Sequence, residues 1–293
     1  MGYTVSHLLK YSYPKSIRLA VGSILATVAL TGLSSCSQFS STDSADTNAS
    51  DSQTNTTVPS PERLVAHVVD THPFNPESFT QGLEVDENGE LLVGTGHYGK
   101  SRIYRADIET HKESASSRMD IDHFGEGITL HGDTVWQLTW KAGEAIKRDA
   151  RSLKEKDRAT YSGEGWGLCA FDDVLWRSDG TSELTSHDPE TFSRKSHFTV
   201  TVDGQEIDQL NELECVSHNG EKYILANVWF STDIYKIDPA TGEVTAIIDA
   251  SSLKNNAADD HNNALNGIAH IPGTDRFLMT GKRWPDLYEV ELR

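Results

Sequence analysis

A single carboxylate, Glu126, stands between two glycines in the segment FGEGIT (Phe124–Thr129). Glycine has no side-chain bulk, so Gly125 and Gly127 leave room for another molecule to approach the carboxylate. A carboxyl group in such a place can accept and return a proton, as general acids and bases do. The alternative is a turn residue that faces water, because short runs of glycine and polar residues are common in turns.

The sequence around Glu126 repeats along the chain. Short alternating apolar runs, separated by Gly, Asp, Asn and Pro, predict many antiparallel strands and an all-β class. Five copies of one three-strand pattern begin about 40 to 53 residues apart, at QGLEV, EGITL, WGLCA, LECVS and NGIAH. Repeats of this length predict a five-bladed β-propeller, with a β-sandwich as the alternative. The run Arg63–His72 precedes the first copy and is expected to close the last blade.

In a propeller, the first strands of all blades line the central channel, so residues at equivalent positions converge. Those positions, together with the ends of the second strands, bear aromatic, carboxylate, amide and lysine side chains. This mixture is typical of a pocket with apolar walls and a few placed polar groups. The predicted pocket residues are Phe79, Gln81, Phe124, Glu126, Trp140, Trp166, Asn211, Glu214, Trp229, Asn266, Lys282 and Trp284.

Some aromatic and acidic residues have simpler explanations. Trp136 and Trp176 stand in the middle of predicted strands, which favours packing in the core. Glu214 has an alternative role, which is to accept hydrogen bonds from backbone N–H groups beside the channel. The segment DDHNN (Asp259–Asn263) is predicted to be a solvated loop.

The ordered motifs FTQGL, FGEGIT, QLTW, GWGL, SDGTS, LNELE, NVW, LNGIA and GKRWP resemble those of the plant-type glutaminyl-peptide cyclotransferases, also called glutaminyl cyclases. The resemblance runs from about His72 to Leu292. It implies a five-bladed propeller and an enzyme that converts the N-terminal glutamine of peptides or proteins to pyroglutamate, with release of ammonia. It also implies that no catalytic zinc is needed.

The resemblance assigns the proton transfers to Glu126, which would take a proton from the α-amine and deliver it to the leaving ammonia. Lys282 and Asn211 are the expected donors to the amide oxygen as it gains charge. Gln81 is expected to bind the first peptide group. Aromatic walls would exclude water and hold the glutamine side chain folded for attack. These walls are Phe79, Phe124, Trp140, Trp166 and Trp229.

No catalytic metal and no cofactor are predicted, because the 12 histidines include no HxxxH or HxH pair at ligand spacing. Two other functions remain as alternatives. One is a metal-dependent lactonase-type propeller, for which six blades are usual and which gives no place to Lys282. The other is a non-catalytic binding module with an aromatic cage for a cationic group, which does not explain Glu126 and Lys282 together.

The N-terminal segment predicts export. Basic residues precede LAVGSILATVALTGL, an apolar run of 15 residues that suits a signal peptide and is short for a membrane span. The run ends in LSSC, which resembles a bacterial lipoprotein signal and implies cleavage before Cys36 and acylation of its thiol. An ordinary secretory signal is the alternative. Ser37 follows the cysteine where an aspartate would suggest retention at an inner membrane, so an outer membrane is the expected location in a cell that has one.

Three segments are therefore predicted: a signal peptide (1–35), a disordered polar tether (36–62) and the propeller (63–293). The formal net charge of −18 argues against nucleic acid as a partner. The expected partners are peptide or protein substrates, with a membrane contacted only through the lipid at Cys36, and the protein is predicted to be a monomer. Cys169 and Cys215 are equally compatible with a disulfide and with two small core residues.

Cys36→Ala should release the protein from membranes and leave the folded domain active, because only the lipid is lost. Fractionation of cells that express the wild type and the variant, with an activity assay on each fraction, tests this. Persistence of the variant in the membrane fraction would contradict the lipoprotein prediction.

Overall fold

The computed structural model describes residues 60–293, so the predicted signal peptide and nearly all of the predicted tether lie outside the described residues. Every named element within 60–293 is a β-strand, which confirms the all-β class. No helix in this range is long and apolar enough to cross a membrane.

Three four-stranded sheets follow one another along the chain, and in each the strands pair antiparallel in sequence order. The first contains β2 (Thr80–Val85), β3 (Glu90–Thr95), β4 (Arg102–Asp107) and β5 (Glu113–Arg118). The second contains β6 (Gly125–His131), β7 (Thr134–Thr139), β8 (Glu144–Asp149) and β9 (Glu155–Thr160). The third contains β10 (Leu168–Phe171), β11 (Val174–Arg177), β12 (Glu183–His187) and β13 (Arg194–Thr199).

The remaining long strands form one eight-stranded sheet in the order β16-β17-β18-β19-β1-β22-β21-β20. Its strands are β1 (Glu62–Pro73), β16 (Leu210–His218), β17 (Glu221–Val228), β18 (Asp233–Ile237), β19 (Val244–Asp249), β20 (Leu265–His270), β21 (Arg276–Gly281) and β22 (Asp286–Leu292). A short hairpin consists of β14 (Thr201–Val202) and β15 (Gln205–Glu206).

The first strand, β1, joins the two ends of the described chain. It pairs in parallel with β19 over Glu62–Val65 and antiparallel with β22 over Ala66–Pro73. The strand predicted at Arg63–His72 is therefore present, and it adds an outer strand to β20-β21-β22 as expected.

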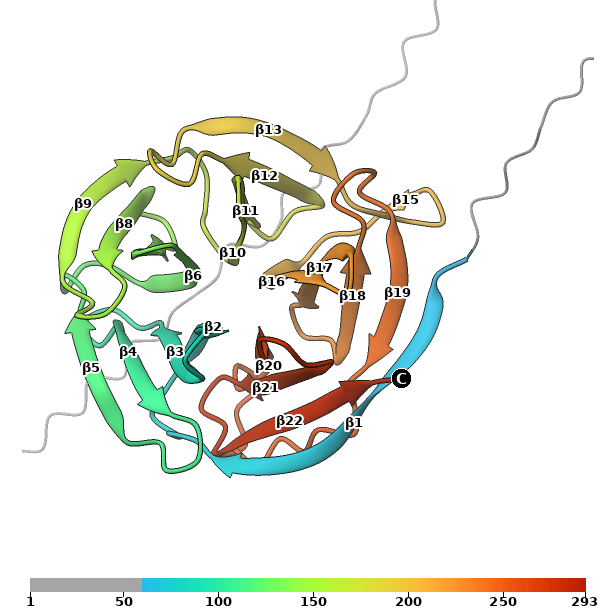
Figure 1. Cartoon of the computed structure of the whole chain (residues 1–293), viewed down its shortest axis with the longest axis horizontal. Coiled ribbons are helices and arrows are strands. Elements are labelled where there is room, and N and C mark those ends of the chain that lie inside the picture. The colour runs from blue at the N-terminus through green and yellow to red at the C-terminus, as the bar shows by residue number, and fades with distance from the viewer. Residues whose placement is uncertain (1–59) are drawn as a thin grey trace, which may run out of the picture. The chain divides into compact units, whose positions relative to one another are not determined.

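The sheets are arranged around a common centre, with β2, β6, β10, β16 and β20 innermost (Figure 1). Each of these inner strands contacts the next, and β20 contacts β2, so the inner strands form a closed ring. This all-β arrangement is compatible with a β-propeller. It brings the beginnings of the inner strands, where most of the predicted pocket residues lie, to the same region.

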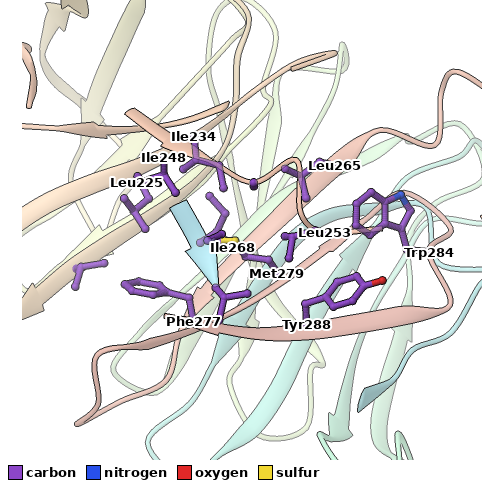
Figure 2. Close-up of a cluster of buried hydrophobic side chains, with 14 residues drawn as sticks. Leu225, Ile234, Ile248, Leu253, Leu265, Ile268, Phe277, Met279, Trp284 and Tyr288 are labelled. Carbon is purple, nitrogen blue, oxygen red and sulfur yellow. The ribbon is translucent and has the colours of Figure 1, made fainter. Parts of the chain in front are cut away.

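Hydrophobic side chains fill the spaces between the sheets. One cluster connects β16–β19 with β20–β22 and includes Ile248, Ile268, Met279 and Trp284 (Figure 2). Trp136 and Trp176 are buried in other clusters, as predicted. Cys169 and Cys215 form a disulfide between β10 and β16, with their Cα atoms 5.2 Å apart, which decides between the two alternatives for this pair.

Glycines let neighbouring inner strands approach closely. A Cβ on Gly127 would lie 2.6 Å from the backbone nitrogen of Leu168, closer than side chains tolerate. A Cβ on Gly167 would likewise overlap the carbonyl oxygen of Asn211. Each of these glycines directly follows a predicted pocket residue, so the close backbone contact fixes that residue next to the neighbouring sheet.

A chain that begins after Thr71 should be much less stable than one that begins at Glu62. The shorter chain loses the buried side chain of Ala66 and most of the hydrogen bonds of β1 to β19 and β22. Several lost hydrogen bonds at about 1 kcal/mol each would lower the melting temperature by roughly 10 °C or more. Thermal unfolding of the two chains measures the difference, and equal melting temperatures would refute a closing role for β1.

Candidate active site

Glu126 lies near the beginning of inner strand β6 and is only 5% exposed. The Gln81 amide nitrogen donates a hydrogen bond of 2.9 Å to its carboxyl oxygen Oε1. Asn266 in turn donates to the Gln81 amide oxygen at 3.1 Å and to the Thr80 carbonyl at 3.0 Å. The alternative of a turn glutamate facing water is therefore wrong, since Glu126 is a buried strand residue held by a relay of two amides.

Burial dominates the electrostatics of Glu126. Loss of solvent raises the pKa of its carboxyl well above the ordinary value of 4.5; the Lys282 charge opposes this shift and the Glu164 charge adds to it. Burial also lowers the pKa of the Lys282 ammonium to about 8, although the Glu126 charge acts in the opposite direction. The site thus contains an acid and a base whose pKa values are displaced toward each other.

Lys282 directly follows β21, and its ammonium lies 5.2 Å from the ring centroid of Phe79. Asn211 lies in β16, is 3% exposed, and its buried amide oxygen has no hydrogen-bond partner among residues 60–293. The buried amide nitrogen of Asn227 and amide oxygen of Asn266 are likewise unpaired in this range. Leaving a buried amide atom unpaired is costly, so packing alone does not account for asparagine at these three positions.

The five predicted wall residues form an aromatic belt in two halves. Its members are Phe79, Phe124, Trp140, Trp166 and Trp229. The ring centroids of Phe79 and Phe124 are 6.1 Å apart, and those of Phe124 and Trp140 are 5.5 Å apart. Trp166 meets Trp229 edge to face at 5.4 Å. All five side chains are partly exposed, as expected for the walls of an accessible pocket.

Glu164 connects the two halves of the belt and was not among the predicted residues. Its Oε2 accepts hydrogen bonds from the indole N–H groups of Trp140 at 2.6 Å and Trp166 at 3.0 Å. The sequence contained a signal for it, because Gly163 and Gly165 flank Glu164 as glycines flank Glu126. Two further residues, His97 and Arg283, adjoin the belt and had no such signal; their contacts depend on how adjacent sheets meet.

Trp284 and Glu214 are two further residues that the sequence predicted to lie in the pocket. The placement of Trp284 in the pocket is wrong: the side chain is 3% exposed in the core cluster, and its indole N–H donates to the Asn263 carbonyl at 2.9 Å (Figure 2). The ring turns inward because Gly281 leaves space beneath it. Glu214 follows its alternative role, since it accepts a hydrogen bond from the His270 backbone N–H at 3.1 Å.

Two more carboxyl groups, Glu84 and Glu212, join Glu214 between the inner strands. Glu212 accepts backbone hydrogen bonds from Leu83 and Ile268, and Glu84 accepts one from Leu130. Burial raises the pKa of Glu84 to about 8 and the pKa values of Glu212 and Glu214 well above 4.5. Charge repulsion adds to each pKa shift: Asp86 acts on Glu84, Glu84 acts on Glu212, and both Glu84 and Glu212 act on Glu214. Through backbone donors these groups connect the inner strands β2, β6, β16 and β20.

Within residues 60–293, no group of three or more His, Cys, Asp or Glu side chains is arranged to hold a metal ion. The expectation of catalysis without a metal remains a prediction, which a chelator tests: activity that survives chelation would support it.

Comparisons with known proteins cover most of the chain. The family model described as glutamine cyclotransferase matches residues 38–292. A glutaminyl-peptide cyclotransferase of Arabidopsis thaliana is 36% identical over 230 residues, covering 77% of this chain and 71% of that protein. The crystal structure of Myxococcus xanthus glutaminyl cyclase matches with a TM-score of 0.73 and 39% identity, covering 79% of this chain and 98% of that chain.

Glu214→Gln should make the domain less sensitive to alkaline pH. A glutamate whose folded-state pKa is raised contributes stability below its unfolded pKa, and this stability is lost as pH rises through the folded pKa. For Glu214 the loss begins above about pH 4.5 and continues as the pH rises through its raised folded-state pKa; for Glu84 that pKa is about 8. The variant should reduce the fall in melting temperature between pH 5 and pH 9 by about 2–4 °C for each kcal/mol of linkage removed.

The matched control for this measurement is Glu87→Gln, because Glu87 is exposed. It should show the same fall in melting temperature as the wild type. A Glu214→Gln variant that also shows the wild-type fall would contradict the assignment of the linkage to the channel.

Proposed function

The chain belongs to the glutamine cyclotransferase family, and we propose that it cyclises the N-terminal glutamine of peptides and proteins to pyroglutamate, releasing ammonia. The observation that supports this most directly is the buried Glu126 carboxyl beside Lys282, adjoining an aromatic belt. A non-catalytic cage would need the belt alone, without these two buried ionisable groups.

Cyclisation forms a bond between the α-nitrogen and the side-chain amide carbon, and breaks the bond from that carbon to the amide nitrogen. The α-nitrogen loses a proton and the leaving nitrogen gains one, so a single group can serve both steps. We assign this transfer to Glu126. Burial raises the pKa of this carboxyl, and this shift lowers the free energy of moving a proton to it from an α-amine, whose ordinary pKa is about 7.7–8.0.

The amide oxygen becomes negatively charged when the amine adds. Lys282 and Asn211 are the proposed donors to it, and a well-aimed donor is typically worth about 3 kcal/mol of the barrier. Lys282 remains largely charged near neutral pH because its pKa is about 8. Burial strengthens its effect, since little water screens the charge.

The aromatic belt would bind the glutamine side chain and keep it folded. Free glutamine side chains sample many rotamers, and only a compact one brings the amine near the amide carbon. Holding that conformer can supply several kcal/mol of the barrier. Glu164 would keep Trp140 and Trp166 oriented through its two hydrogen bonds.

The contacts of Gln81 favour a positioning role, although binding of the first peptide group also remains a prediction. Its amide nitrogen donates to Glu126 and its amide oxygen accepts from Asn266. Gln81 would thus fix the carboxyl orientation for proton transfer.

Several properties of the whole molecule complete the proposal. We propose five blades, because the eight-stranded sheet divides at the short parallel pairing of β1 with β19, giving two units beside the three four-stranded sheets. We also propose that the protein is exported, anchored by a lipid at Cys36 on the periplasmic or cell-surface side, monomeric, and active without a metal.

A direct assay tests the activity. The purified domain is incubated with Gln-Ala, and ammonia and the cyclised dipeptide are measured together. Equal amounts of both products are expected. A well-folded protein that binds the dipeptide without releasing ammonia would favour the binding module instead.

Glu126→Gln should lower turnover by about 10³- to 10⁴-fold, because the amide keeps the shape of the side chain but cannot exchange protons. The melting temperature and the affinity for substrate should change little. Steady-state ammonia release and thermal unfolding measure these quantities. Near-normal turnover in a folded variant would falsify the proton-transfer role.

Two further variants separate the other contributions. Lys282→Ala should lower turnover by less than Glu126→Gln does, roughly 10²-fold, because it removes one oxyanion donor. Trp166→Ala should chiefly raise KM, since the belt acts in binding and orientation. An equal loss of turnover in all three variants would mean that they disturb one common structure and not distinct steps.

A further inference from the structure

A cationic pocket lies beside the aromatic belt. We use this name for a cavity of about 740 Å³ lined by Lys100, Arg102, Arg118 and Arg283, with Glu77 as the acidic side chain in its wall. Four cations in one pocket are unusual in a chain whose formal net charge is −18. This local reversal of charge suggests a binding site for an anion.

The cationic pocket and the belt share a wall. The His97 ring lies 4.5 Å from Phe79 and 5.7 Å from Phe124, and Tyr98 meets Phe124 edge to face at 5.5 Å. The Arg283 guanidinium hydrogen-bonds His97 at 2.6 Å and lies 4.9 Å from the Phe79 centroid. A molecule bound at the belt can therefore extend into the cationic pocket.

Only two of the four cations have acidic partners. Arg102 forms a two-pronged pair with Glu113 at 2.7 Å, and Arg283 approaches Asp260 at 3.4 Å. No carboxylate in residues 60–293 lies within 4.0 Å of the Lys100 or Arg118 cations. These two side chains are exposed and free to meet an incoming charge.

The strand register adds a second, independent observation. Arg102 on β4 and Arg118 on β5 are direct cross-strand partners. Like charges directly opposite each other destabilise an antiparallel pair. The pair with Glu113 offsets the Arg102 charge, so Arg118 is the cation of this strand pair that an anion would neutralise.

We propose that the cationic pocket binds a carboxylate of the substrate, one to three residues after the N-terminal glutamine. This inference rests on the proposed function. An extended chain advances about 3.3–3.6 Å per residue, so three residues reach roughly 10 Å from the belt. The carboxylate can belong to an aspartate or glutamate side chain or to the C-terminus of a short peptide, and the substrate class is accordingly acidic.

Four peptides distinguish these sources. Gln-Ala-Asp-NH2 and its neutral partner Gln-Ala-Asn-NH2 differ by a side-chain carboxylate, and Gln-Ala-Ala-OH and Gln-Ala-Ala-NH2 differ by a terminal one. For at least one pair, kcat/KM at low salt should be about fivefold higher for the acidic peptide, mainly through KM. The preference should shrink as sodium chloride is raised.

Arg118→Glu tests the pocket directly, and Arg151→Glu is the matched control. Arg151 is exposed in the turn between β8 and β9, outside the pocket, and its substitution makes the same change in net charge. The ratio of kcat/KM for acidic over neutral peptide should fall to about one or below in Arg118→Glu and stay at the wild-type value in the control. Melting temperatures establish that both variants are folded.

The outcomes separate the two proposals. Equal kcat/KM for the acidic and neutral members of both pairs in the wild type, or a ratio that both Arg118→Glu and Lys100→Glu leave unchanged, would overturn the carboxylate pocket. Absence of ammonia from all four peptides would instead contradict the proposed function. In that case, salt-dependent binding of the same peptides, with and without Arg118→Glu, decides whether the pocket selects acidic ligands.

Discussion

The burial of the Glu126 carboxyl is the constraint on which the site depends. Removing a charged carboxylate from water costs several kcal/mol unless hydrogen bonds or opposite charges compensate, and otherwise the group takes up a proton. Here the compensation comes from two other sheets: Gln81 on β2 donates to the carboxyl, while in the eight-stranded sheet Asn266 on β20 holds Gln81 and Lys282 after β21 supplies the opposing charge. Because the partners belong to different sheets, the chemistry requires the closed ring.

The ring can hold such a relay because its inner strands are in backbone contact. Gly127 brings β6 against the start of β10, and Gly167 brings the start of β10 against β16. The side chain preceding each glycine is fixed next to the neighbouring sheet. In the corresponding place after Asn211 the chain has Glu212, whose carboxyl accepts backbone hydrogen bonds from β2 and β20. At this position the polar side chain of Glu212 connects the strands through hydrogen bonds, whereas a glycine would let the strand backbones touch directly.

The sequence was sufficient to predict the features that follow from repetition. Period and alternation predicted the strands, and equivalent positions in the repeats predicted that Gln81, Glu126 and Asn266 converge, as their hydrogen bonds show. The direction of a side chain after the end of a strand was harder to predict. Lys282 and Trp284 are two residues apart, yet only Lys282 adjoins the belt. That choice depends on packing against other strands, which a local pattern does not encode.

Contacts between residues at non-equivalent positions of the repeats also could not be predicted from the sequence. The Cys169–Cys215 disulfide requires β10 and β16 to lie at one particular separation, and 46 intervening residues conceal it. The cross-strand pair of Arg102 and Arg118 depends on the register of β4 and β5, where a shift of one residue would place the two cations differently. Glu164 was the exception, because its flanking glycines repeat the pattern around Glu126.

Burial of the Glu126 carboxyl is costly in free energy, but it also suits this group to catalysis. Desolvation raises the pKa of this carboxyl and lowers that of Lys282 to about 8, so both move toward the range of an α-amine. In water, a carboxyl and an amine differ by several pKa units, and returning a proton from the amine to the carboxylate would be strongly uphill. In this site the difference is smaller, while Lys282 still bears the charge that an oxyanion requires. A more exposed site would hold both groups at a lower cost in folding free energy. It would also restore the large pKa difference between carboxyl and amine, and one carboxyl could then not easily take a proton and give it back.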